Sequence, residues 1–278
     1  MAIAPEHFNY LRNLAATRSG VLLEPRAAYL AEGRLLPLAQ EKGMASVMEL
    51  IEELERAADN GIHQAAVEAL LPSDTAFFRD MHPFLALRTQ IFKTLEMKRG
   101  GERRLAIWCA GCASGQEAYS VAMLIHFYFP EFLKWDLHLI ATDLSQEALN
   151  RAKEGRYNDI ETHRGLPAML LRQYLRQDGR NYLIKEDVAR LVQFEELNLV
   201  GEWPSLPALD VVLLRNVVGH FAPESRKTVL AKVGQLLKQD GFLLLGARET
   251  TIDVDAPFNL VPAENAYFFQ PCPKPADQ

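Results

Sequence analysis

The stretch with the clearest chemical potential is residues 105–120, which read LAIWCAGCASGQEAYS. An apolar run over 105–108 suits a buried strand, only small side chains follow over 109–115, and Glu117 then stands in the first turn of an amphipathic helix. A strand, a small-residue turn and a helix let a nucleotide-type ligand lie against backbone at a helix N-terminus. The spacing matches neither GxGxxG nor GxxxxGK(S/T), so close helix–strand packing is the alternative explanation.

Polar side chains also stand where the other predicted strands end. Each has a local explanation, since Asp143 could cap the next helix and Asn198 could close a turn. In a parallel sheet, however, the carboxyl ends of the strands share one edge, and ligands bind there. The gathering of such residues at five strand ends therefore predicts a ligand site, built from Gly111 and Glu117, then Asp143, then Asn198-Leu199, then Arg215-Asn216, and finally residues 247–249.

The elements that must position these residues alternate along the chain from about residue 103. This alternation predicts an α/β fold with a doubly wound, mostly parallel sheet. The polar interval 155–190 is expected to form a short inserted hairpin or β-subdomain, and the Pro-rich residues 271–278 a loose tail. Expected strands are 103–109, 137–142, 191–195, 209–214, 241–246 and 266–270, and expected helices are 83–98, 116–128, 145–154 and 223–238.

The first 72 residues show helical periodicity alone, near 6–17, 25–42, 45–58 and 62–71. A boundary at Pro72-Ser73 therefore predicts two domains, a small all-helical one over 1–72 and a second one over 73–278. Just past this boundary, Phe77-Phe78 beside Arg79 form an apolar anchor next to a fixed cation.

Composition limits the function classes. A net charge of −6 and a pI near 5.7 argue against a general nucleic-acid binder. No apolar run approaches the roughly 18 residues of a membrane span, and the first residues lack the order of a signal peptide. With three cysteines, a disulfide framework is not expected. Cys109 and Cys112 have no second pair for a metal, so we expect packing rather than metal or redox chemistry, and a cytoplasmic protein.

Several motifs in fixed order give a resemblance to a known family. They are T-x-FFR over 75–79, W-x-A-x-x-x-x-G-x-E-x-YS over 108–120, ATD over 141–143, G-x-Y over 155–157, F-x-x-x-NL over 194–199 and RNV over 215–217. Together they resemble the CheR-type chemoreceptor glutamate O-methyltransferases across about 15–270. The resemblance implies a Rossmann-like methyltransferase sheet over 73–278, with the helical N-terminal domain and a short inserted β-subdomain.

The resemblance also implies the cofactor, S-adenosylmethionine, with S-adenosylhomocysteine as its product. It places Arg79 near the transferred methyl group and the incoming carboxylate, and His220 at the position of a family tyrosine near that methyl, so both are expected catalytic residues. The expected cofactor-binding residues are Ser73, Thr75, Arg79, Gly111, Glu117, Asp143, Asn198, Leu199, Arg215 and Asn216. No metal is expected. A glutamate acceptor, with a pKa near 4.3, is already ionised at neutral pH, so the reaction needs no general base.

The chain departs from the family pattern at several positions. Ser73 replaces an asparagine, Ala118 a proline, His220 a tyrosine, and Ala247-Arg248 the family's His-Ser. Because these changes concentrate on the acceptor side, two alternatives stay open. One is a methyltransferase of this fold with another acceptor, and the other is an inactive S-adenosylmethionine- or S-adenosylhomocysteine-binding signalling module.

The partner implied by the resemblance is the helical cytoplasmic domain of a chemoreceptor. Basic residues of the N-terminal domain, such as Arg26 and Arg34, are a candidate docking surface for it, although solvated helix faces are the favoured explanation of these charges. The short segment 177–181 favours recognition without a tether. Neither nucleic-acid binding nor membrane insertion is expected.

Overall fold

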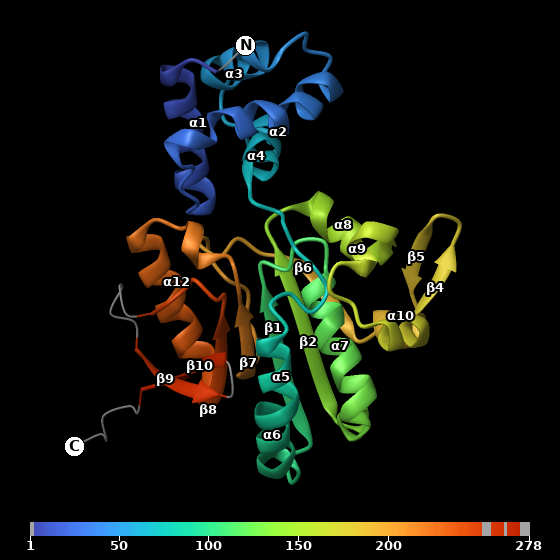
Figure 1. Cartoon of the computed structure of the whole chain (residues 1–278). Helices are drawn as coiled ribbons and strands as arrows, with labels where there is room; N and C mark the ends of the chain where they lie inside the picture. Colours follow the sequence, from blue (N-terminus) through green and yellow to red (C-terminus); the bar gives the residue numbers. More distant parts are fainter. Residues whose placement is uncertain (1–2, 252–256, 264–265, 273–278) are drawn as a thin grey trace, which may run out of the picture. The chain divides into compact units, whose positions relative to one another are not determined.

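The predicted parallel sheet is present and forms the centre of residues 73–278 (Figure 1). The computed structural model describes residues 3–251, 257–263 and 266–272. The seven-stranded sheet has the order β6-β2-β1-β7-β8-β10-β9, in which β10 is antiparallel to both neighbours and the other pairs are parallel. The strands are β1 (Arg104–Ala110), β2 (Asp136–Asp143), β6 (Val192–Glu196), β7 (Leu209–Leu214), β8 (Leu237–Leu245), β9 (Phe258–Ala263) and β10 (Ala266–Pro271).

The central strands are buried on both faces, as their apolar runs predict. Ile107 of β1 and Leu213 of β7 belong to one hydrophobic core with side chains of α5 (His82–Ala86), α6 (Phe92–Arg99) and α7 (Gln116–Tyr128). Trp108 points to the other face, because strand side chains alternate, and it is also fully buried. Outside the insert at 155–190, the helices of this part are α5, the π-helical η2 (Leu87–Ile91), α6, α7, η3 (Pro130–Lys134), α8 (Gln146–Glu154), η4 (Val218–His220) and α12 (Pro223–Leu236).

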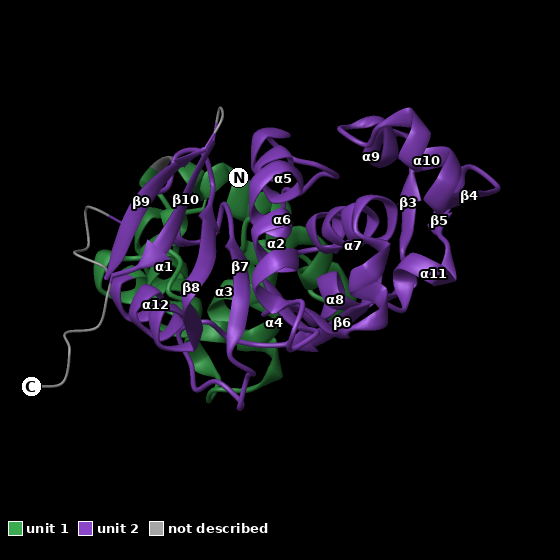
Figure 2. Ribbon diagram, turned by 90° about the horizontal axis from the view of Figure 1, so that it is seen from below, with its two compact units in different colours: residues 1–72, 219–226 green, residues 73–218, 227–278 purple. Residues whose placement is uncertain are grey.

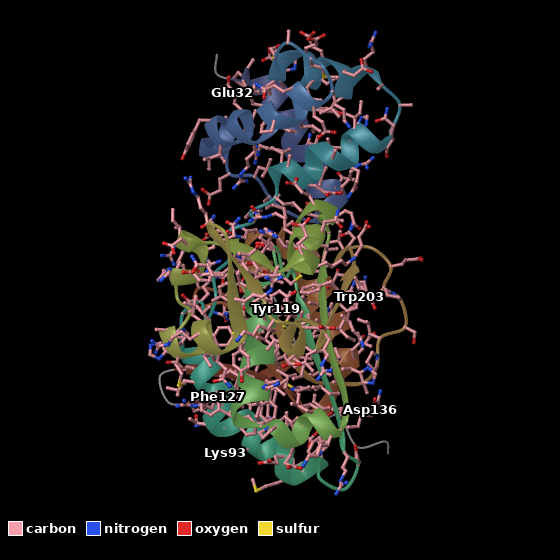
Figure 3. The ribbon with its side chains drawn as sticks, turned by 90° about the vertical axis from the view of Figure 1, so that its right-hand side faces the viewer. Glu32, Lys93, Tyr119, Phe127, Asp136 and Trp203 are labelled. Atoms are coloured by element: carbon pink, nitrogen blue, oxygen red, sulfur yellow. The ribbon has the colours of Figure 1, made fainter. Side chains whose placement is uncertain are left out.

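The molecule divides into two compact units (Figure 2). The larger unit comprises residues 73–218 and 227–278, and the smaller unit comprises residues 1–72 together with 219–226. Within the larger unit, Tyr119 of α7 lies in the interior, while Lys93 of α6 and Asp136 at the start of β2 lie toward one end (Figure 3).

The smaller unit is helical, as the periodicity predicts. Its amphipathic helices bury Leu11, Leu35, Leu50 and Leu54 against one another. The side chain of Asn60 caps the helix that begins at Gly61 by accepting a hydrogen bond from the Ile62 N–H. The helices are α1 (Pro5–Ser19), η1 (Pro25–Ala27), α2 (Ala28–Glu41), α3 (Val47–Arg56) and α4 (Gly61–Leu70).

The short segment 219–226 joins the smaller unit through backbone pairing. The N–H of Leu22 donates to the carbonyl of His220 at 2.7 Å, and the N–H of Ala222 donates to the carbonyl of Gly20 at 3.0 Å. An isolated antiparallel bridge joins Val21 to Phe221. A segment that follows the fourth strand of the parallel sheet therefore belongs to the helical unit, which no local pattern predicts.

The insert at 155–190 contains the expected small β-structure. A three-stranded antiparallel sheet has the order β3-β5-β4, and β4 and β5 form a hairpin that turns at Gly179, where φ is +64°. Two short helices separate β3 from β4. The elements are β3 (Arg156–Asn158), α9 (Asp159–His163), α10 (Ala168–Tyr174), β4 (Leu175–Asp178), β5 (Asn181–Ile184) and α11 (Glu186–Ala189).

Two strand predictions were wrong. We expected the helix before β8 to run to residue 238 and the strand to begin at 241, yet β8 begins at Leu237, directly after α12. A register shift between Leu209 and Val211 accommodates the early residues of β8, and Asp240 there binds Arg99 of α6. Strand β9, which contains Pro262, was not predicted. It lies at the edge of the sheet, paired only with β10, where a proline is tolerated.

At the amino ends of the strands, Asp240 gives a testable pH dependence. Hydrogen bonds from Arg99, whose nitrogens lie 2.5 and 3.2 Å away, lower the pKa of Asp240 to about 2. Because the folded pKa lies below the usual 3.9, this stabilisation is present above about pH 4 and is lost as pH falls toward 2. Since the side chain is 38% exposed, we expect a loss of only about 1 kcal/mol in unfolding free energy. Urea unfolding between about pH 4 and 2 should show a smaller loss of unfolding free energy in Asp240→Asn than in the unaltered protein. The exposed Asp187→Asn is the control. Equal slopes in all three proteins would show that this pair does not act in solution.

Candidate functional site

The turn after β1 is held by backbone bonds to the end of β2. The N–H groups of Gly111 and Cys112 donate to the carbonyl of Thr142 at 2.8 and 2.9 Å. Gly111 has φ +72°, and a Cβ there would lie 2.5 Å from a methyl of Val217, so only glycine fits. Gly115, with φ +90°, is the N-cap residue of α7, and a Cβ there would lie 2.8 Å from the Cβ of Ala152. Both the ligand explanation and the packing explanation of this turn are therefore compatible with its geometry.

Asp143 binds this same turn. Its Oδ2 accepts the N–H of Ala113 at 2.8 Å, and its Oδ1 accepts the N–H of Ser145 at 2.9 Å. The capping of α8 falls to Ser145 rather than to Asp143, because the Ser145 hydroxyl accepts the N–H of Ala148. A carboxylate offers about four acceptor positions, and Asp143 is only half-buried. Its carboxylate can therefore also accept hydrogen bonds from ligand hydroxyls.

Arg215, just after β7, pairs with two carboxylates. Its Nη1 donates to Glu117 Oε2 at 2.6 Å, and its Nη2 donates to Asp80 Oδ2 at 2.9 Å. The side chain is fully buried, and its guanidinium carbon lies 5.4 Å from the ring centre of Phe84. Burial raises the pKa of Glu117, while the positive charge of Arg215 opposes the rise. Arg215 thus connects the first turn of α7 to the segment that precedes α5.

That segment, residues 73–81, is called the strap below. Phe78, Asp80 and Met81 all have positive φ (48°, 63° and 39°), a conformation that costs on the order of 1–3 kcal/mol for each non-glycine residue. Several contacts hold it in place. The N–H of Phe78 donates to Ser120 Oγ at 2.9 Å, and Arg215 donates to the carbonyl of Arg79 at 2.8 Å. Backbone strain of this kind is maintained at functional sites when the surroundings fix it.

Arg79 itself is turned toward the start of the strap. Its Nη1 donates to the carbonyl of Asp74 at 2.6 Å, and its Nη2 lies 3.5 Å from the Asp74 carboxylate. Asp74 also accepts two hydrogen bonds from Arg164 of the insert, at 2.7 and 3.2 Å, which lower its pKa. Arg79 keeps 30% of its side chain exposed.

Asn198, Leu199 and Asn216 lie at further strand ends of the same unit. Asn198 closes a turn, as its local explanation requires, by accepting the N–H of Val200 at 3.1 Å. The carbonyl of Leu199 accepts the indole N–H of Trp203 at 3.0 Å. Asn216 has φ +59°, and its N–H donates to Glu249 at 2.7 Å.

The structure brings some of the predicted residues together. Glu117 and Arg215 meet the strap that carries Ser73, Thr75 and Arg79, of which Ser73 is exposed and Thr75 half-buried. His220 is exposed and belongs to the smaller unit, so its catalytic assignment stays a prediction.

Asp80 was not among the predicted site residues, and Glu249 was predicted only as part of the polar group 247–249. Asp80 directly follows the FFR motif, and Glu249 ends the polar group after β8. Both residues therefore belong to, or adjoin, a motif that the sequence analysis had identified. Only the fold shows that Asp80 accepts a hydrogen bond from Arg215 and that Glu249 accepts one from Asn216.

The residues present fit an S-adenosylmethionine-type ligand. The Nε of Arg215 is buried and has no hydrogen-bond partner among the residues that the structure describes. An unsatisfied buried donor is costly, and an acceptor on a bound ligand would satisfy it. Glu117 and Asp143 offer acceptors for an ammonium group and for hydroxyls. Cys109 and Cys112 are buried, and burial raises the pKa of both thiols, which keeps them in the neutral form.

The doubly wound, mostly parallel sheet places residues 73–278 in the Rossmann-like fold class. The sequence profile described as "CheR methyltransferase, SAM binding domain" matches residues 73–267. The chain therefore belongs to the CheR methyltransferase family. This membership makes it a protein-glutamate O-methyltransferase with S-adenosylmethionine as cofactor.

Relatives match nearly the whole chain. "Chemotaxis protein methyltransferase 1" of Pseudomonas aeruginosa is 32% identical over 94% of this chain and 96% of its own length. "Chemotaxis protein methyltransferase Cher2" of Pseudomonas putida is 30% identical over 95% and 97%. Among solved structures, PKMT2 from Rickettsia typhi has a TM-score of 0.37 at 14% identity, covering 63% of this chain and 26% of that one. Among the described residues, no helix has both the length and the apolarity needed to cross a bilayer.

Proposed function

We propose that this enzyme transfers the methyl group of S-adenosylmethionine to glutamate side chains in the helical cytoplasmic domain of a chemoreceptor. The observation that carries the proposal is the buried Arg215–Glu117 pair, which also holds the strap bearing Arg79. One ion-paired cluster thus links residues proposed for the cofactor to the residue proposed for the acceptor. The relatives' printed names, which are those of chemotaxis protein methyltransferases, support this acceptor class.

The proposed cofactor site lies along the carboxyl ends of the parallel strands. Glu117 accepts a hydrogen bond from the ligand's ammonium group, Asp143 accepts from its hydroxyls, and Gly111 allows close approach to backbone. The Nε of Arg215 donates to a ligand acceptor. The remaining members are Ser73, Thr75, Arg79, Asn198, Leu199 and Asn216.

The proposed chemistry follows from the charges of the reacting groups. When bound, S-adenosylmethionine supplies a methyl group made electrophilic by its sulfonium. A glutamate carboxylate is ionised at neutral pH, so the protein has no proton to remove. Its contribution is alignment, which can supply on the order of 7–11 kcal/mol of the barrier reduction. Arg79 pairs with the acceptor carboxylate and orients it, and His220 is proposed to lie near the transferred methyl group.

We assign the two parts of the chain separate tasks. Residues 73–278, with the insert at 155–190, carry the transfer, and residues 1–72 dock the receptor in the cytoplasm. Receptor bundles that carry glutamates are acidic, which favours basic docking residues. Arg34 donates to the carbonyl of Leu70 at 2.7 Å within its own unit, so only part of its hydrogen-bonding capacity is available to a partner. The side chain of Arg26 lies outside the described part of the chain.

Changing Asp143 to alanine is expected to weaken S-adenosylhomocysteine binding by about ten- to a hundredfold. A hydrogen bond to a charged acceptor contributes about 1.5–3 kcal/mol, and about 1.4 kcal/mol is a factor of ten in Kd. Isothermal titration calorimetry measures the effect, and the exposed Asp187→Ala serves as the matched control. Unchanged affinity in Asp143→Ala, with binding by the unaltered protein, would remove Asp143 from the site.

A further inference from the structure

A single carboxylate oxygen ties together the ends of two neighbouring strands. Oε2 of Glu249, four residues after β8, accepts the N–H of Asn216 and the N–H of Gly246, both at 2.7 Å. Asn216 follows β7 by two residues, and Gly246 follows β8 directly. The N–H of Glu249 in turn donates to the carbonyl of Gly246 at 2.9 Å, which closes the turn.

The local backbone is built around this contact. A Cβ at Gly246 would lie 2.7 Å from Glu249 Oε2 and 2.8 Å from the backbone nitrogen of Asn216, so only glycine leaves room for the carboxylate. Asn216 has φ +59°, in the left-handed region that non-glycine residues rarely adopt without support. The hydrogen bond from its N–H to Glu249 supplies such support.

The backbone conformation of Asn216 affects the orientation of the preceding residue, Arg215. Arg215 is the buried arginine that donates to Glu117, to Asp80 and to the carbonyl of Arg79. A change in the backbone at Asn216 would redirect both the Asn216 amide and the Arg215 guanidinium. Alignment is the main contribution of the protein in this reaction, and small displacements of positioned groups are costly to such catalysis.

We infer that Glu249 is a positioning residue for the cofactor site, acting by fixing the backbone of Asn216 and thereby the side chains of Arg215 and Asn216. The inference rests on the proposed function, because it assigns those two residues to the cofactor. In this role the length of the Glu249 side chain matters more than its negative charge. Arg248, the neighbouring departure from the family pattern, is exposed in the same turn and is not needed for this role.

Two conservative variants separate the effect of side-chain length from the effect of charge. Glu249→Gln keeps an acceptor oxygen at the same distance along the side chain and removes the charge, whereas Glu249→Asp keeps the charge and shortens the side chain by one methylene. We expect Glu249→Asp to raise the Kd of S-adenosylhomocysteine and the KM for S-adenosylmethionine by about tenfold. Glu249→Gln should stay within about twofold of the unaltered enzyme. The exposed Glu96→Ala on α6 is the control.

Calorimetry gives the Kd, a methyl-transfer assay with a receptor cytoplasmic fragment gives KM and kcat, and urea unfolding checks that each variant is folded. Weak binding in Glu249→Asp together with near-normal binding in Glu249→Gln supports the inference. Normal binding in Glu249→Asp, or equal losses in both variants, overturns it. If the unaltered enzyme binds no S-adenosylhomocysteine, the proposed function fails first and the inference fails with it.

Discussion

Replacing Arg215 with methionine is expected to lower the free energy of unfolding by about 3–5 kcal/mol and to abolish measurable S-adenosylhomocysteine binding. The guanidinium is fully buried, and Glu117, only 12% exposed, is left without its partner when it is removed. The strap also loses the hydrogen bonds to the carbonyl of Arg79 and to Asp80 that support its strained backbone. Urea unfolding and calorimetry measure the two effects.

The double variant Arg215→Met with Glu117→Gln tests the physical reason for this loss. If the cost comes from an unpaired buried carboxylate, the double variant unfolds less easily than Arg215→Met alone. The pKa of Glu117 is already raised by burial, and loss of Arg215 raises it further. A folded pKa above the unfolded value destabilises the protein at higher pH, so the loss in Arg215→Met shrinks as pH falls toward the pKa of Glu117. A loss independent of pH, and equal in both variants, would mean that the pair is not formed in solution. The exposed Arg190→Met is the control.

Changing Arg79 to alanine is expected to lower kcat by about a hundredfold while leaving the Kd of S-adenosylhomocysteine within a few-fold of normal. Arg79 is proposed to orient the acceptor carboxylate, and misplacement of a reacting group costs about that much. Among the described residues its side chain bonds to Asp74 in the strap, whereas the buried cluster uses its backbone carbonyl, which alanine retains. Steady-state methyl transfer and calorimetry, measured on the same preparation, separate the two steps.

Arg172→Ala is the matched control, since this arginine is exposed on α10. Arg79→Lys keeps the positive charge but loses the two-pronged geometry of the guanidinium, so its kcat should fall between those of alanine and arginine. Full turnover in Arg79→Ala would remove Arg79 from the acceptor side of the site. A parallel loss of turnover and of cofactor binding would instead assign Arg79 to the cofactor-binding site alone.

The sequence was informative wherever a local rule decides the structure. The apolar run 105–108 and the small residues after it predicted a buried strand, a tight turn and a helix, because only such residues fit two covered sheet faces and close backbone approach. The glycines at 111 and 115 confirm this locally, each with a positive φ and a neighbour that excludes a side chain. Asp143 and Arg215 were predicted for the site because the carboxyl ends of parallel strands share an edge.

Other features depend on contacts between distant segments. Asp80 accepts a hydrogen bond from Arg215, which lies 135 positions later, and Glu249 accepts one from a backbone N–H that lies 33 positions earlier. The early start of β8 follows from a register shift and from the pairing of Asp240 with Arg99. The assignment of 219–226 to the helical unit rests on backbone pairing with residues 20–22. No periodicity or capping signal encodes such pairings.

The acceptor is the central claim, and mass mapping of the methylated product tests it most directly. The enzyme is incubated with S-adenosylmethionine and the helical cytoplasmic fragment of a chemoreceptor from the same organism, and the fragment is then digested and analysed by mass spectrometry. We predict a mass increase of one methylene on glutamate-containing peptides, removed by mild alkali as expected of an ester. A methyl group on another residue type, or no transfer by protein that binds S-adenosylhomocysteine, would contradict the account.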